Sequence, residues 1–154
     1  MKLFGFRFLS SAAFIVVLTG AIALFPAPAR AGFEPQAPHG GVLVPVGDDF
    51  AHVELVLDPK EGSLSAYILD GEAEEVVPLK QPVLLVMLTG FPKTLKLKAV
   101  VSPLSGEKPG ETSSYALTDP ALKGIGPLSG VLVWININGN VFRDLPFQFP
   151  AKNG

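Results

Sequence analysis

The chain has no cysteine, only two histidines, two methionines and a single tryptophan among its 154 residues. Without cysteine it has no disulfide framework, no thiol chemistry and no thiolate metal site, so an ordinary hydrophobic core must stabilise the fold. It also has no Gly-x-Ser-x-Gly motif, no P-loop and no dinucleotide fingerprint, and nothing marks an activated serine. We therefore predict that the protein is not an enzyme.

The first 31 residues have the layout of a secretory signal peptide. Lys2 and Arg7 form a positive n-region, residues 8–25 are apolar and uncharged, and residues 29–31 (Ala-Arg-Ala) form a small-x-small cleavage site. We predict cleavage after residue 31 and hence a periplasmic or secreted protein. The alternative is an uncleaved membrane anchor, because a bilayer is spanned by about 20 apolar residues. No cysteine follows the apolar run, which excludes a lipid-anchored lipoprotein.

Removal of this segment makes the chain more acidic. The whole chain has a net charge of −2 at pH 7, and the removed segment carries three basic residues and no acid, so subtracting three from −2 gives −5. A mildly acidic domain repels nucleic acid and anionic lipid. We expect neither as a partner, and we expect no membrane span in the mature chain.

The mature chain consists of short β-type runs separated by proline and glycine, with no sustained helical period. After an extended leader at residues 32–38, we predict a single domain over residues 39–154. Its expected fold is an all-β, antiparallel, immunoglobulin-like sandwich of roughly seven to nine strands; a closed barrel is the alternative. The expected strands are 42–46, 51–58, 64–69, 76–79, 83–89, 94–101, 113–117, 130–138 and 141–149.

Turn residues predict the hairpins and the faces of the strands. Asn138-Gly139 is typical of a type I′ turn, and residues 47–49 and 58–62 are expected to join neighbouring strands. Alternation assigns Val53, Leu55 and Leu57 to the face that meets Leu64, Ala66 and Ile68, with His52, Glu54, Tyr67 and Leu69 on the other face. Lys96 and Lys98 indicate a solvated face and the protection of an edge strand. Pro146 indicates an edge or a bulge in the last strand.

The single tryptophan has three alternative roles. Trp134 is expected to share its side of the strand with Leu132 and to face Arg143 across the Asn138-Gly139 hairpin. It could be the large core residue of a sandwich, a partly exposed ring stacked on the arginine, or a platform that binds a sugar.

The two histidines offer a metal-site hypothesis. His52 and Glu54 place an imidazole and a carboxylate on one face of a strand, within about 7 Å of each other. His39 and Asp70 are candidates for further ligands, and such a set suits Zn(II) or Cu(II). His52, fixed by its strand, is expected to be the stronger ligand. The alternative is a half-exposed His52 paired with Glu54, and a His39 that is only a loop residue.

Register limits this hypothesis. If Val46 pairs with Phe50, then Val44 faces His52, and His39 lies several residues further along the chain. Only a bulge or fold-back at Gly40-Gly41 would bring His39 close to the strand.

The same residues carry a family resemblance. Residues 38–41 (Pro-His-Gly-Gly), 52–56 (His-Val-Glu-Leu-Val) and 67–71 (Tyr-Ile-Leu-Asp-Gly) resemble a small group of exported bacterial proteins. They are also similar to segments near the start of periplasmic adaptor subunits of heavy-metal efflux pumps. The resemblance spans residues 38–79. It implies a periplasmic β-domain that handles metal ions, with matching positions at His39, His52, Glu54 and Asp70.

The chain departs from this pattern in two ways. Glu72 stands where many relatives have a histidine, and the mature part has only one methionine, Met87, so the Met-rich or His-rich tract of a dedicated copper carrier is missing. We predict an exported, non-enzymatic binding or accessory protein that binds a Zn or Cu ion in heavy-metal efflux or tolerance. Its expected partner is an envelope or efflux-system protein. The alternative is a metal-free envelope interaction or structural module.

Overall fold

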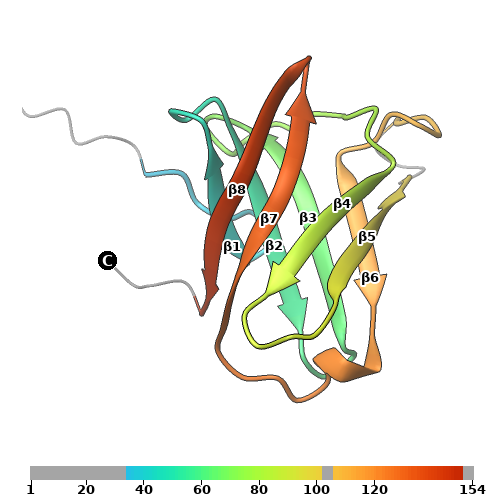
Figure 1. Cartoon of the computed structure of the whole chain (residues 1–154). Helices are drawn as coiled ribbons and strands as arrows, with labels where there is room; N and C mark the ends of the chain where they lie inside the picture. The colour runs from blue at the N-terminus through green and yellow to red at the C-terminus, as the bar shows by residue number, and fades with distance from the viewer. Residues whose placement is uncertain (1–33, 102–105, 151–154) are drawn as a thin grey trace, which may run out of the picture. The chain divides into compact units, whose positions relative to one another are not determined.

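The computed structural model describes residues 34–101 and 106–150, which form eight strands in one antiparallel sheet (Figure 1). The predicted all-β antiparallel fold is confirmed, and the sheet order is β1-β2-β3-β6-β5-β4-β7-β8. The elements are β1 (Val42–Val46), β2 (Ala51–Asp58), β3 (Ser63–Asp70), β4 (Val83–Leu88), β5 (Thr94–Val100), β6 (Ser114–Thr118), the 3₁₀ turn η1 (Pro120–Leu122), β7 (Leu128–Ile137) and β8 (Asn140–Phe149).

The predicted signal peptide, its cleavage site and the alternative anchor lie outside the described residues. Within the described part of the chain, no helix is long and apolar enough to cross a membrane. The expected strand at 76–79 is wrong: its ends make only isolated bridges, Val76 with Leu69 and Leu79 with Thr112.

The sheet curls so that its two end strands come close together (Figure 1). The rings of Phe50, after β1, and Phe142, in β8, have centroids 5.7 Å apart. In the described residues β1 and β8 are nevertheless the two ends of the strand order, so the ladder is open between them. A sheet folded over in this way buries one face as a core, as a sandwich does.

The core follows the predicted alternation. Val53 and Leu55 of β2 are buried against the side chains of β3 that alternation assigned to them, and Leu57 is partly buried beside them. The expected loops at 58–62 and Asn138-Gly139 form, with positive φ at both residues of the second. Lys96 and Lys98 are exposed. Their strand β5 lies between β4 and β6, however, so the prediction of an edge strand there is wrong.

The β1–β2 hairpin is one residue longer than expected. Val46 pairs with Ala51, not with Phe50, and Leu43 therefore lies opposite Glu54. Two residues of the loop, Gly47 and Asp49, adopt positive φ, which a four-residue connection accommodates.

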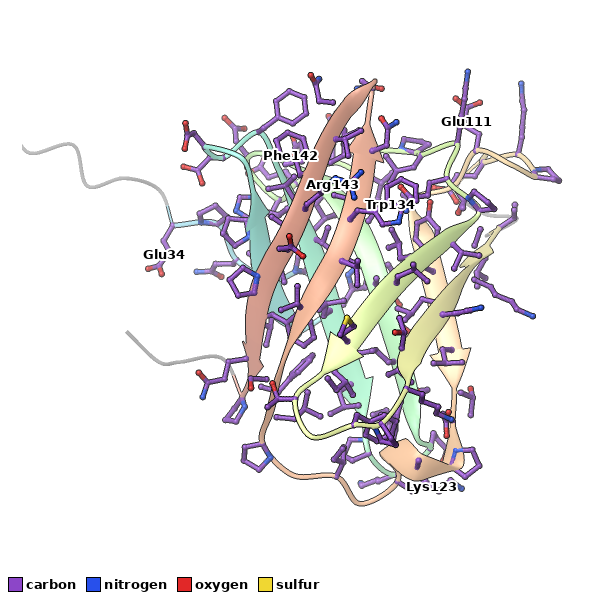
Figure 2. The ribbon with its side chains drawn as sticks, viewed as in Figure 1. Glu34, Glu111, Lys123, Trp134, Phe142 and Arg143 are labelled. Atoms are coloured by element: carbon purple, nitrogen blue, oxygen red, sulfur yellow. The ribbon has the colours of Figure 1, made fainter. Side chains whose placement is uncertain are left out.

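The β7–β8 hairpin exchanges its faces halfway along. Side chains on one face of a regular strand alternate, so they lie an even number of residues apart. Leu132 and Ile135 are both fully buried although they are three residues apart. Asp144 of the neighbouring strand β8 has a φ of 53° at this level. Trp134 therefore does not share the face of Leu132 and is half-buried outside the core, contrary to the prediction. Its expected pairing with Arg143 is confirmed (Figure 2). β8 is an edge strand, as Pro146 indicated.

Candidate functional site

A fully buried carboxylate lies at the centre of the candidate site. Glu54 of β2 has an exposed fraction of 0 %. Its Oε1 accepts hydrogen bonds from the backbone N–H groups of His39, at 2.8 Å, and Gly41, at 2.9 Å. Its Oε2 lies 2.7 Å from His39 Nδ1. Burial of a carboxylate costs several kcal/mol unless hydrogen bonds compensate it, and these three contacts provide that compensation.

The imidazole of His39 is held in one orientation. Its ring stacks on Tyr67 of β3, with centroids 3.8 Å apart and planes 9° apart. An ionised carboxylate only accepts hydrogen bonds, so toward such a carboxylate Nδ1 is the donor, and the lone pair of the imidazole in that tautomer lies on Nε2. The His39 side chain is 43 % exposed, and within the described residues Nε2 has no hydrogen-bond partner. We call His39, Glu54 and Tyr67 the imidazole cluster.

Two glycines bring His39 back onto β2. Gly40 has a φ of 73° and its N–H donates to the carbonyl oxygen of Ala37, which closes a turn around His39. At Gly41 a Cβ atom would lie 2.3 Å from the carbonyl oxygen of Leu55, so only glycine fits. The fold-back that the sequence required at Gly40-Gly41 is present.

His52 and Asp70 lie apart from this cluster. His52 is 4 % exposed, and its Nδ1 is 3.3 Å from the backbone carbonyl oxygen of Asp70. The Asp70 carboxylate instead accepts from the N–H groups of Glu74 and Glu75, and these hydrogen bonds lower the pKa of Asp70. His52 and Asp70 are thus engaged in holding the turn after β3.

Of the four predicted site residues, the structure brings only His39 and Glu54 into side-chain contact. In residues 34–101 and 106–150, no group of three or more His, Cys, Asp or Glu side chains is placed to hold a metal ion. Tyr67 is the member of the site that the sequence reasoning left without a role. The register of the β2–β3 hairpin, which sets Tyr67 directly opposite Glu54, is the feature that could have indicated its place in the site.

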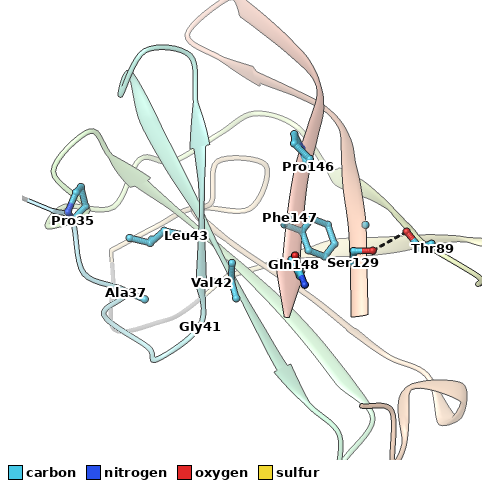
Figure 3. A pocket seen from close by; sticks show the side chains of 11 residues that line it. Pro35, Ala37, Gly41, Val42, Leu43, Thr89, Ser129, Pro146, Phe147 and Gln148 are labelled. Carbon is cyan, nitrogen blue, oxygen red and sulfur yellow. Dashed lines mark hydrogen bonds between the residues drawn. The ribbon is translucent and has the colours of Figure 1, made fainter. Parts of the chain in front are cut away.

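A groove of about 750 Å³ separates the two end strands of the sheet (Figure 3). One wall is formed by Pro35, Ala37 and residues 41–43, the other by Pro146, Phe147 and Gln148 of β8. At the start of β7, Ser129 Oγ donates to Thr89 Oγ1 at 3.0 Å and closes the far side. We call this opening the edge groove.

Comparisons with protein-family models, with curated proteins and with solved structures found no match to this chain.

Proposed function

We propose that the protein is an exported, non-enzymatic binding protein that carries a divalent transition metal, Zn(II) or Cu(II), through His39, in the service of heavy-metal efflux or tolerance. The observation that supports this proposal is the 2.7 Å contact between His39 Nδ1 and the buried Glu54 carboxylate, beneath a partly exposed ring. Metal-ligating histidines almost always donate their other N–H group to a carboxylate, a backbone carbonyl or water.

This geometry gives Glu54 a different role from the one that the sequence suggested. Both of its oxygens are occupied by the His39–Gly41 turn, so Glu54 orients the imidazole without ligating the metal. His39 then replaces His52 as the principal ligand, because the His52 ring is buried and engaged with Asp70.

A single imidazole supplies one of the four ligands that zinc prefers. The others must come from water or from a partner protein. Such an incomplete site suits an accessory protein that passes a metal ion to an efflux-system partner rather than one that stores it.

Calorimetric titration of the exported protein with Zn(II) and Cu(II) tests this proposal. Because one imidazole ligates, we expect weak affinity between about 1 and about 0.1 mM, about −4 to −5.5 kcal/mol, that weakens further at acidic pH because a protonated imidazole cannot ligate. His39→Ala should abolish binding, and His52→Ala is the matched control that should retain it. Wild-type protein that binds neither ion, or a His39→Ala variant that binds as the wild type does, would refute the proposal.

The edge groove supports a second candidate, a metal-free interaction module of the envelope. Each of β1 and β8 has only one paired neighbour in the described sheet, and both border the groove. An extended segment of a partner could add to such an edge through main-chain hydrogen bonds.

This candidate predicts that extended peptides selected by display on the exported protein protect the amides of β1 or β8 from hydrogen exchange. Val42→Arg should abolish that protection, because it places a long charged side chain in the groove. Lys96→Ala, on the exposed face of β5, is the control. Peptides that protect other strands would contradict the interaction-module function.

A further inference from the structure

A second concavity, of about 520 Å³, lies beside Trp134 at the end of β7. It is lined by the segment 78–82, by Glu111 and by residues of the β7–β8 hairpin: Trp134, Asn136, Asn138 and Gly139. Figure 2 shows Trp134 and Glu111 toward the same end of the sheet. None of these residues belongs to the imidazole cluster or to the edge groove.

One wall of this concavity is fixed by a buried side chain. Gln81 is 7 % exposed; its Nε2 donates to the carbonyl oxygens of Val83, at 2.9 Å, and Trp134, at 3.5 Å. Its Oε1 accepts from the N–H of Asn136, at 3.0 Å. The Gln81 amide therefore continues the hydrogen-bond ladder along β7 beyond the start of β4 at Val83.

The backbone of this wall is also held from behind. The Tyr115 hydroxyl donates to the carbonyl oxygen of Gln81 at 2.8 Å, and Leu79 exchanges two backbone hydrogen bonds with Thr112. The concavity is thus preformed, which lowers the ordering cost of binding a ligand.

The exchange of faces in the β7–β8 hairpin places Trp134 and Asn136 together in this lining. Asn136 Oδ1 accepts from the N–H of Gly139 at 2.9 Å, which leaves its NH₂ group free to donate. Asn138, Lys80 and Glu111 are exposed around the concavity. Besides the engaged Gln81 amide, the site therefore combines one large apolar ring, the amides of Asn136 and Asn138, one cation and one anion.

We propose that this concavity binds a pyranose unit of a glycan, with Trp134 as its stacking platform. A sugar ring has an apolar face of C–H groups and a rim of hydroxyls that both donate and accept, and the lining offers matching chemistry. The opposite charges of Lys80 and Glu111 favour a neutral ligand over an ionic one. The volume lies within the range of about 300–1,000 Å³ that is typical of small-molecule sites.

Intrinsic fluorescence tests this proposal directly, because Trp134 is the only tryptophan of the chain. The full exported protein is titrated with maltotriose, cellotriose and chitotriose, and with pentaproline as a peptide probe. We expect a saturable change of the Trp134 emission with at least one oligosaccharide and none with pentaproline. No change with any of the three sugars, or saturation by pentaproline alone, would overturn the proposal.

Calorimetry with the sugar that binds then locates the site. Trp134→Ala should lower its affinity about tenfold or more, and Asn138→Gly about threefold. Asn138 has a φ of 52°, which glycine adopts without strain, so that variant keeps the hairpin folded. Lys96→Ala, on the exposed face of β5, is the control. Unchanged affinity in both site variants would place the sugar elsewhere and refute the assignment.

Discussion

Replacement of Glu54 separates the structural contribution of the buried carboxylate from its contribution to the imidazole. Glu54→Ala removes the acceptor of two backbone N–H groups and of His39 Nδ1, and leaves a cavity at a fully buried position of β2. Breaking a buried charged contact of this kind typically costs about 3–5 kcal/mol. His39 is 43 % exposed, so water can hydrate part of what is lost, and we expect the lower end of that range.

Glu54→Gln keeps the shape of the side chain. Its carbonyl oxygen can accept from both backbone N–H groups, but its NH₂ then faces His39 Nδ1, which must become the acceptor. Charge-assisted hydrogen bonds contribute about 1.5–3 kcal/mol and neutral ones about 0.5–1.5 kcal/mol. We therefore expect Glu54→Gln to lower the free energy of unfolding by about 1–2 kcal/mol, clearly less than Glu54→Ala.

Urea denaturation of the wild type and the two variants measures these differences. Glu61→Gln, in the exposed turn between β2 and β3, is the matched control and should change the free energy of unfolding by less than about 0.5 kcal/mol. A Glu54→Ala variant as stable as this control would show that the carboxylate does not fasten the segment that precedes β1.

Three further predictions concern backbone fit and ionisation. Gly41→Ala should lower the free energy of unfolding by about 2 kcal/mol or more in urea, because no room exists for its Cβ, whereas Gly126→Ala, where a Cβ meets nothing within 4 Å, should be nearly neutral. Burial raises the pKa of Tyr115 from 10.0 to about 12, so its stabilising effect should be complete below pH 10 and disappear as the pH rises toward 12; ultraviolet titration of wild type and Tyr115→Phe checks this. The pKa of Asp70 is lowered from 3.8 by backbone hydrogen bonds, so the stability that Asp70 contributes should be present above that pH and be lost below it, and thermal unfolding of Asp70→Asn should lack that loss.

Much of the strand framework could be predicted because it depends on local signals. The Asn138-Gly139 turn and the alternation in β2 and β3 are encoded within a few residues, and each determines which side chains reach the core. Strand order depends instead on long-range pairing, which is why Lys96 and Lys98 suggested an edge that is not there. The exchange of faces around Trp134 accompanies a positive φ at Asp144, and no pattern in the sequence indicates it.

The candidate site, too, could be predicted from local sequence signals only in part. Both members of the His39–Glu54 pair were candidates because their residue types suit metal chemistry, and the glycines after His39 allowed the bulge or fold-back that their contact required. Their roles could not be assigned from sequence, because the burial of Glu54 depends on the turn at residues 37–41 lying against β2. The strand register determines which other side chains join the site, because it sets Tyr67 opposite Glu54 and His52 opposite Pro45 and Leu69.

The presence of a carboxylate rather than an amide at the buried position 54 bears on function as well as on stability. A neutral amide could accept from the N–H groups of His39 and Gly41 at a lower desolvation cost. What only the carboxylate adds is an acceptor that fixes the proton on Nδ1 and so keeps Nε2 available to ligate. If that addition serves a metal, Glu54→Gln should weaken metal binding about 10–100-fold while unfolding changes modestly. If metal binding and stability fall only in proportion, or the metal affinity is unchanged, the carboxylate serves the fold alone, and the edge groove becomes the better candidate for the function.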